Sequence, residues 1–142
     1  MSHITMIKVE IRDLEALKAA CTRLGFQFRE GQRTYKWYGR YVGDALLPEG
    51  VKVEDLGKCD HVIRVAGAAY EVGVLRQGDR YGLLWDSWQA GGLEAHLGPN
   101  AERLVQMYAL EAARAQAQRQ GFSVWEEAQE DGSVQLHIQT GE

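Results

Sequence analysis

Apolar residues alternate along the start of the chain and then take up helical spacing, which predicts a strand followed by a helix. In "SHITMIKVEI" apolar and β-branched side chains recur at about every second position. Leu14, Leu17 and Leu24 then follow at the spacing of one helix face. Asp13 is suited to cap the start of this helix and Gly25 to end it, so the pattern predicts a first β-α unit.

Further short runs predict strands in "FQFRE", "RTYKWYGRY" and "DHVIRVAG". The segment "AYEVGVLRQGDRYGLLWDSW" predicts a hairpin that turns at residues 77–79, where Gly78 supplies the positive φ.

The segment "GPNAERLVQMYALEAARAQAQRQG" predicts the longest helix, with Asn100 as its N-cap and Gly121 as its stop. It spans about five turns at 3.6 residues per turn. The terminal segments "FSVWEEAQ" and "VQLHIQ" predict a hairpin around Asp131 and Gly132.

Two segments with matching residues suggest how these elements assemble. Arg, Gly, Phe and Glu recur at the same offsets in "RLGFQFRE" and "RQGFSVWE", each at the end of a predicted helix. The chain therefore divides into two β-α-β-β halves. We predict an α+β fold in which two helices pack on one face of an antiparallel sheet, in a ferredoxin-like (split β-α-β) pseudo-two-fold arrangement.

Between the halves, residues 42–58 contain Pro48 and three glycines without a clear period, which predicts an inserted loop. The chain has 142 residues, 45% hydrophobic and 25% charged, as expected for a single domain over residues 1–142. No apolar run reaches the roughly 18 residues of a membrane span, and the N-terminus lacks signal-peptide features. Two cysteines suit a reducing compartment, so we expect a cytoplasmic protein without membrane contact.

The net charge of −4 disfavours non-specific binding to nucleic acid by the whole molecule. The charge is unevenly distributed along the chain. Residues 23–40 carry five basic side chains against Glu30, whereas residues 122–142 carry five acidic side chains and no lysine or arginine. This asymmetry can steer association with a partner, although such runs are also typical of solvated surfaces.

Catalytic patterns are weak. Cys59, Asp60 and His61 are adjacent in sequence, but on a strand Asp60 points away from the other two. The remaining His and Cys residues lie scattered, without the close second pair of a zinc site. The glycines of "QAGGLEAHLGPN" match neither the P-loop nor the dinucleotide fingerprint. We therefore expect no catalytic residue, no metal site and no cofactor.

The strongest candidate for binding is "RTYKWYGRY", with three basic and four aromatic side chains in nine residues. As a strand it would bury Tyr35, Trp37 and Tyr41 and expose the alternate positions. The exposed side is either a solvated surface or a basic aromatic patch. The residues of that patch are Arg29, Arg33, Lys36, Tyr38 and Arg40. In "LLWDSW", Trp88 lies beyond the strand pattern and is either an exposed anchor or a packed side chain.

Three segments carry a family resemblance. They are "MSHITMIKVEIRDLEALKAA", "YEVGVLRQGDRYGLLWDSW" and "ERLVQMYALEAARAQAQRQGFSVWEEAQEDGSVQLHIQ". Together they resemble an uncharacterised domain family of cyanobacteria, red-algal plastid genomes and some bacteriophages. The chain departs from plastid relatives at residues 40–58, where "YVGDALLPEGVKVEDLGK" is inserted. The resemblance implies a small soluble intracellular protein and brings no catalytic residues, substrate or cofactor.

From these features we expect a non-catalytic binding or regulatory accessory protein that acts on a macromolecular partner. The charge balance favours another protein as that partner. A basic aromatic strand on an open sheet also suits single-stranded nucleic acid, which is the alternative, and a small enzyme is the third possibility.

Overall fold

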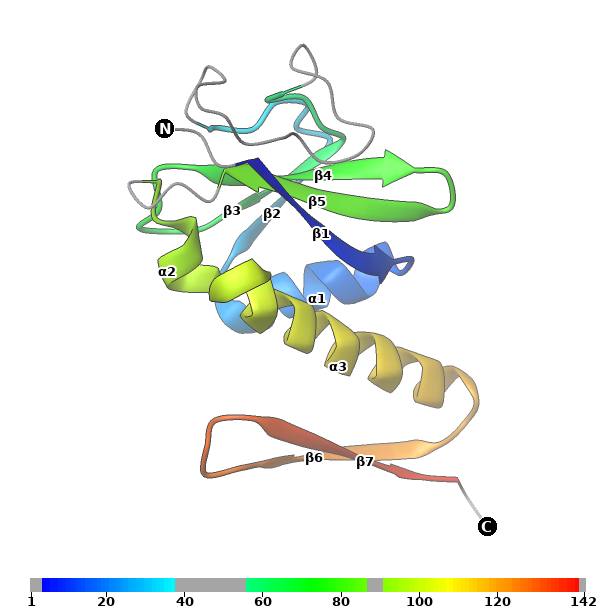
Figure 1. The fold of residues 1–142 in the computed structure, drawn as a ribbon. Helices are drawn as coiled ribbons and strands as arrows, with labels where there is room; N and C mark the ends of the chain where they lie inside the picture. The colour runs from blue at the N-terminus through cyan, green and yellow to red at the C-terminus, as the bar shows by residue number, and fades with distance from the viewer. Residues whose placement is uncertain (1–3, 38–55, 87–90, 141–142) are drawn as a thin grey trace.

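The computed structural model describes residues 4–37, 56–86 and 91–140 (Figure 1). Its main element is a five-stranded antiparallel sheet with the strand order β1-β5-β4-β3-β2. These strands are β1 (Ile4–Ile11), β2 (Gln27–Glu30), β3 (His61–Arg64), β4 (Glu71–Gln77) and β5 (Arg80–Asp86). The helical elements are α1 (Leu14–Leu24), α2 (Leu93–Leu97), the 3₁₀ turn η3 (Pro99–Ala101) and α3 (Glu102–Arg119). The chain ends in β6 (Ser123–Ala128) and β7 (Val134–Gln139).

The α+β class and the antiparallel sheet are confirmed, and α1 and α3 lie together on one face of the sheet (Figure 1). The ferredoxin-like, pseudo-two-fold arrangement is not confirmed. Among the described strands, β6 and β7 pair with each other alone and form a separate two-stranded sheet beyond α3. The matching segments "RLGFQFRE" and "RQGFSVWE" both turn from a helix into a strand, but only β2 joins the main sheet.

The main core lies between this sheet and the two helices. α1 begins where the Asp13 carboxylate accepts a hydrogen bond from the Ala16 N–H at 3.0 Å, and it ends at Gly25 with φ 78°. Both caps agree with the prediction. α3 contributes Leu104 and Tyr108, and the Tyr108 hydroxyl accepts hydrogen bonds from backbone N–H groups at the β1–α1 junction. No helix within the described ranges is long and apolar enough to cross a membrane.

The predicted N-cap of α3 is wrong. Asn100 lies inside the 3₁₀ turn that Pro99 begins, at a positive φ of 55°. α3 begins at Glu102, and Ala101 precedes it without a side-chain cap. The residues "LEAHL" form the short helix α2, which was not predicted from the sequence. The length of α3, 18 residues, agrees with the predicted five turns.

The face of the sheet opposite the helices carries a second, smaller core of Tyr35, Leu56, Cys59, Val62 and Leu84. Residues 33–37 lie over this face and form an isolated bridge between Thr34 and Lys58 rather than a strand. The strand predicted at "RTYKWYGRY" is therefore wrong for these residues. The predicted alternation does hold for residues 35–37, because Tyr35 is buried, Lys36 is exposed and Trp37 is half-buried. Leu56 and Gly57, at the end of the predicted insertion, are also buried here.

The β6–β7 hairpin packs against α3 on the side away from the sheet (Figure 1). An ion-pair network fixes it there. Glu126 on β6 pairs with Arg23 of α1 at 2.7 Å and with Arg114 of α3. Arg23 also pairs with Glu111 at 2.9 Å. Because these side chains are mostly shielded from solvent, the network contributes more than an isolated surface pair.

Glu126→Gln is expected to loosen this hairpin by about 1 kcal/mol, since the charge-assisted bonds are lost. Hydrogen exchange of the β6 and β7 amides should therefore accelerate. The ion pairs with Arg23 and Arg114 lower the pKa of Glu126 in the folded protein. Their contribution is complete above the ordinary carboxyl pKa and is lost as the pH falls through the lowered value.

Wild-type hairpin amides should consequently lose protection in acid below about pH 4, whereas those of Glu126→Gln should show a weaker dependence. Glu130→Gln is the matched control, because it removes the same charge from an exposed position at the turn of the same hairpin. Equal acceleration in both variants would show that the network does not hold the hairpin.

Candidate functional site

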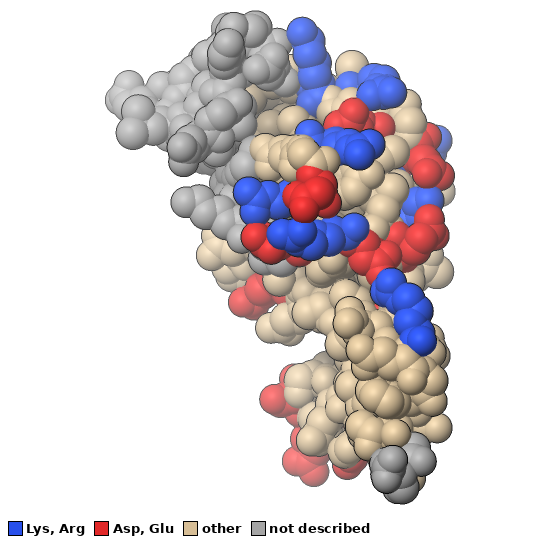
Figure 2. All heavy atoms as spheres, turned by 90° about the vertical axis from the view of Figure 1, so that its right-hand side faces the viewer, with Lys and Arg blue, Asp and Glu red and all other residues tan. Residues whose placement is uncertain are grey.

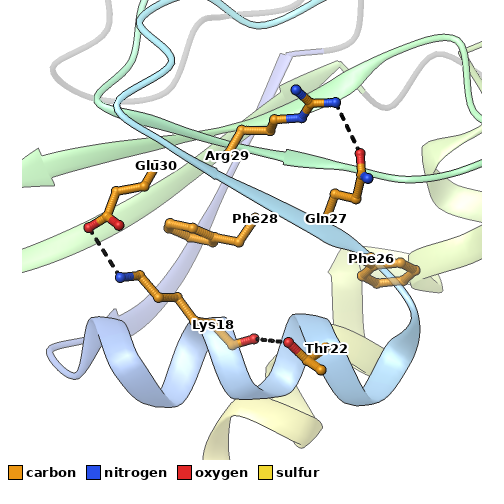
Figure 3. Close-up of a pocket in the computed structure, with 7 residues that line it drawn as sticks. All are labelled: Lys18, Thr22, Phe26, Gln27, Phe28, Arg29 and Glu30. Carbon is orange, nitrogen blue, oxygen red and sulfur yellow. Dashed lines mark hydrogen bonds and ion pairs between the residues drawn. The ribbon is translucent and has the colours of Figure 1, made fainter.

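An open groove runs between α1 and the edge strand β2 (Figure 3). Its volume is about 450 Å³. Helix α1 supplies one wall and the strand with its preceding residue supplies the other. The lining residues are Lys18, Thr22, Phe26, Gln27, Phe28, Arg29 and Glu30. They come from one helix–turn–strand unit, so the groove is built by local sequence.

β2 is the last strand of the sheet and pairs only with β3 among the described residues. Along such a strand, every second residue directs its backbone N–H and C=O away from the sheet. These groups are a ready template for another extended chain. The groove therefore combines side chains of α1 with the hydrogen-bonding edge of a strand.

Phe28 forms the floor of the groove next to the helix, and it packs partly against the main core. The ammonium group of Lys18 lies 5.7 Å from the centre of its ring. Lys18 also forms ion pairs of 3.1 Å with Glu30 and with Glu15. The hydrogen bonds to Glu30 and then to Glu15 raise the pKa of Lys18. Lys18 is thus positively charged, and the neighbouring carboxylates of Glu15 and Glu30 compensate its charge.

Of the predicted binding residues, Arg29 lines this groove. It lies on the opposite side of β2 from Phe28, and its guanidinium donates to the Gln27 amide oxygen at 3.2 Å (Figure 3). Arg64 of β3 is paired in register with Gln27 and is exposed on the same face as Arg29. Arg29 and Arg64 therefore place two cations on the outer face near this edge.

Arg33 and Lys36 are exposed but lie outside the groove lining. Arg33 forms a 2.9 Å ion pair with Asp60. Lys36 is positioned by its backbone, which exchanges two hydrogen bonds with the buried Glu71: its N–H donates to the carboxylate at 3.0 Å, and its C=O accepts from the Glu71 N–H at 2.8 Å. The remaining predicted binding residues, Tyr38, Arg40 and Trp88, lie outside the described residues.

The adjacent residues Cys59, Asp60 and His61 each bind a different group. The Cys59 thiol donates to the Gln32 carbonyl at 3.3 Å, and burial raises its pKa to about 11. Asp60 accepts from the Arg76 N–H at 2.7 Å, and His61 Nδ1 accepts from the Gly31 N–H at 3.0 Å. These contacts stabilise local backbone and leave Cys59 in its unreactive thiol form at neutral pH.

No group of three or more His, Cys, Asp or Glu side chains in residues 4–37, 56–86 and 91–140 is arranged to hold a metal ion. Charged side chains on the body of the protein are interspersed in sign (Figure 2). The ion pairs that join Glu10 to Arg12 and Arg80, and Arg12 to Asp79, belong to this pattern.

Sequence analysis missed Lys18, Thr22, Phe26 and Phe28 as site residues. Lys18 and Thr22 are four residues apart and so share a face of α1, and Phe26 and Phe28 alternate along the strand. Both spacings are visible in the sequence, but they also describe an ordinary helix packed beside an ordinary strand. What distinguishes them is that β2 is an edge strand, and strand order depends on pairings distant in sequence.

Comparison with known proteins connects this fold to a family. A family model described as "Protein of unknown function (DUF1257)" matches residues 20–137, which include the whole groove except Lys18. The chain belongs to the DUF1257 family. The protein is also 31% identical, over 98% of its length and 97% of the relative's, to the "Uncharacterized protein ycf35" of Pyropia yezoensis. No solved structure matches the chain.

The family resemblance stated from the sequence is therefore confirmed. The DUF1257 family description states no activity, and the printed name of the Pyropia relative states none either. Neither name therefore assigns a function to this DUF1257 protein.

Proposed function

We propose that this protein is a non-catalytic binding protein that captures an extended segment of a partner protein along the edge of β2. The observation that carries the proposal is the open groove between α1 and an edge strand with no outer neighbour among the described residues. Addition of a peptide strand beside a helix is a recurring mode of peptide recognition. It requires no chemistry, which fits an accessory or regulatory role.

The two parts of the groove would contribute differently to binding. The outward N–H and C=O groups of β2 would pair with any extended backbone and so supply affinity. Specificity would come from side chains of the bound strand, which alternate between the two sides of the extended sheet. On the helix side they would meet Phe28 and Lys18, and on the outer side Arg29 and Arg64.

Charge favours a protein over nucleic acid as the partner. A nucleic acid requires several unmatched cations along its path. Here Lys18 pairs with Glu15 and Glu30, and Arg33 pairs with Asp60. Arg29 and Arg64 add two cations near this edge, fewer than a nucleic-acid strand would need along its path. The net charge of −4 adds a general repulsion of polyanions.

The decisive variant is Thr22→Trp, which places a large side chain in the groove from an exposed position on α1. Short random peptides displayed on phage should be selected by the wild-type protein, and the enriched peptides then measured as free peptides by isothermal titration calorimetry. Their affinity for Thr22→Trp should fall at least tenfold, or about 1.4 kcal/mol. Bound peptide should also shift the amide resonances of residues 27–30.

The matched control is Gln106→Trp, which adds the same side chain at an exposed position of α3. It should bind the peptides within about twofold of wild type, a difference of about 0.4 kcal/mol. Peptides that bind Thr22→Trp as tightly as wild type would disprove the groove. A preference for single-stranded oligonucleotides that is lost on raising the salt concentration would instead support the alternative, a nucleic-acid-binding module.

A further inference from the structure

The β6–β7 hairpin presents a face that the fold does not use. Side chains alternate between the two faces of the hairpin, and the face that carries Glu126 lies toward α1 and α3. The opposite, outer face carries Trp125 and Glu127 on β6 and their cross-strand partners His137 and Gln135 on β7. Trp125 is 50% exposed. Among the described residues, the other large apolar side chain that is exposed is Ile138, at 45%.

Three of these side chains form one arrangement. The indole of Trp125 stacks on the imidazole of His137, with ring centres 5.2 Å apart and planes 10° apart. His137 Nε2 lies 3.0 Å from a carboxylate oxygen of Glu127. His137 therefore covers one face of the indole and fixes its orientation, while half of the Trp125 surface remains open to solvent. An ordered, open indole face is suited to bind a cation.

The charge of the hairpin indicates the same kind of occupant. Residues 120–140 contain four acidic side chains and no lysine or arginine. Glu126 is neutralised by Arg23 and Arg114, whereas Glu127 lies on the opposite face of β6. Glu127, Glu130 and Asp131 line an open hollow of about 840 Å³ at the end of the hairpin. Acidic side chains also mark the hairpin in Figure 2, whereas lysine and arginine are visible only above it.

We propose that the outer face of this hairpin binds a lysine- or arginine-rich segment of a second protein. One cationic side chain lies over the open face of Trp125, and the neighbouring cations pair with Glu127 and the acidic end of the hairpin. The site is separate from the β2 groove, because the hairpin packs on the far side of α3 from the main sheet. The protein then has two docking surfaces and can connect two partners.

The probe is a fluorescently labelled peptide of alternating arginine and glycine, measured by fluorescence anisotropy with the full-length protein at low and moderate salt. Trp125→Ala should weaken binding at least about fivefold, the loss expected when a cation loses an aromatic face. Glu127→Gln should weaken it about threefold, since one carboxylate at the contact is neutralised. A peptide of alternating glutamate and glycine should not bind.

Matched controls separate this site from general attraction to an acidic protein. Glu94→Gln removes the same charge as Glu127→Gln from an exposed position on α2, and it should change the affinity by less than about 1.5-fold. Thr22→Trp, which fills the β2 groove, should leave binding unchanged. Failure of the hairpin site and failure of the groove are therefore distinguishable.

Trp125→Phe tests whether weaker binding by Trp125→Ala reflects unfolding of the hairpin. Phenylalanine keeps an aromatic face and the stacking on His137. It should bind within about threefold of wild type, with the β7 amide resonances unchanged. The proposal is overturned if wild type does not bind the arginine peptide. It is also overturned if Trp125→Ala binds as well as wild type while retaining the hairpin resonances, or if Glu94→Gln weakens binding as much as Glu127→Gln.

Discussion

Replacing Trp85 by alanine is expected to lower the free energy of unfolding by about 3–5 kcal/mol. Trp85 is 1% exposed and lies on β5, where it packs with residues of the main core beneath the sheet. Its removal leaves a cavity that the rigid sheet and the two helices cannot close. Urea denaturation followed by circular dichroism measures the loss, and the variant should unfold cooperatively at a much lower urea concentration.

Trp125→Ala is the natural control, since it makes the same change at a half-exposed position. It should cost less than about 1 kcal/mol of global stability, because little buried surface is lost. Trp85→Phe should cost less than half as much as Trp85→Ala. Phenylalanine retains most of the apolar volume, and the buried indole nitrogen has no hydrogen-bond partner among the described residues to lose. Similar losses at positions 85 and 125 would contradict the assignment of Trp85 to the core.

Much of the fold was predictable because local signals determine it. Asp13 and Gly25 cap α1 as expected, and Gly78 turns the β4–β5 hairpin at a positive φ of 69°. In the terminal hairpin, Asp131 accepts a hydrogen bond from the Ser133 N–H at 2.9 Å and Gly132 has a φ of 87°. In each case one or two residues with a strong conformational preference decide the turn.

The errors arose where distant contacts decide the structure. The repeated Arg, Gly, Phe and Glu pattern describes how a helix turns into a strand, but it does not say which strand will be the neighbour. β6 pairs with β7 instead of joining the main sheet, and Glu126 bonds Arg23 and Arg114 on the side of the helices away from that sheet. The error at Asn100 has a local cause instead: the residue looked like an N-cap, but the adjacent Pro99 begins a separate turn before α3.

The candidate site was predicted only in part for the same reason. Arg29 was identified by its charge, and it does line the groove. Arg33 has an equally suggestive charge, but Asp60, which pairs with it, lies 27 residues later in the chain. Trp125 was not among the predicted binding residues, and a tryptophan in an alternating strand pattern resembles a core residue. Only the position of the hairpin beyond α3 leaves the face of Trp125 open.

The second core depends on a glycine at one central position of the sheet. The ring of Tyr35 packs directly on Gly73 of β4, so that a β-carbon on Gly73 would lie 2.6 Å from Cδ1 of the ring. Tyr35 is 4% exposed, and its N–H is held by the Gly57 carbonyl at 2.9 Å. Burial raises the pKa of the Tyr35 hydroxyl to about 12, as expected for a phenol shielded from water. The ring therefore has little freedom to move aside.

Gly73→Ala is expected to displace Tyr35 and to cost about 1–3 kcal/mol, the usual penalty for overpacking a filled core. The damage should be greatest on this face of the sheet. Cys59 belongs to the same core, and burial suppresses its thiolate by raising its pKa to about 11. When Tyr35 is displaced, Cys59 should become accessible, and its alkylation by iodoacetamide should accelerate at least about tenfold, because the exposed thiol returns toward its ordinary pKa.

Cys21 provides an internal reference for this experiment, since it lies on the buried face of α1 in the main core and burial raises its pKa to about 12. Mass spectrometry of the alkylated peptides should show Cys59 modified well before Cys21. Gly82→Ala is the matched variant, because it makes the same change on the neighbouring strand β5. There the new β-carbon lies nearest to the end of the long Gln77 side chain, 2.9 Å from Oε1, rather than against a buried aromatic ring. Unchanged Cys59 reactivity in Gly73→Ala, or equal effects of the two variants, would show that Tyr35 is not held against Gly73.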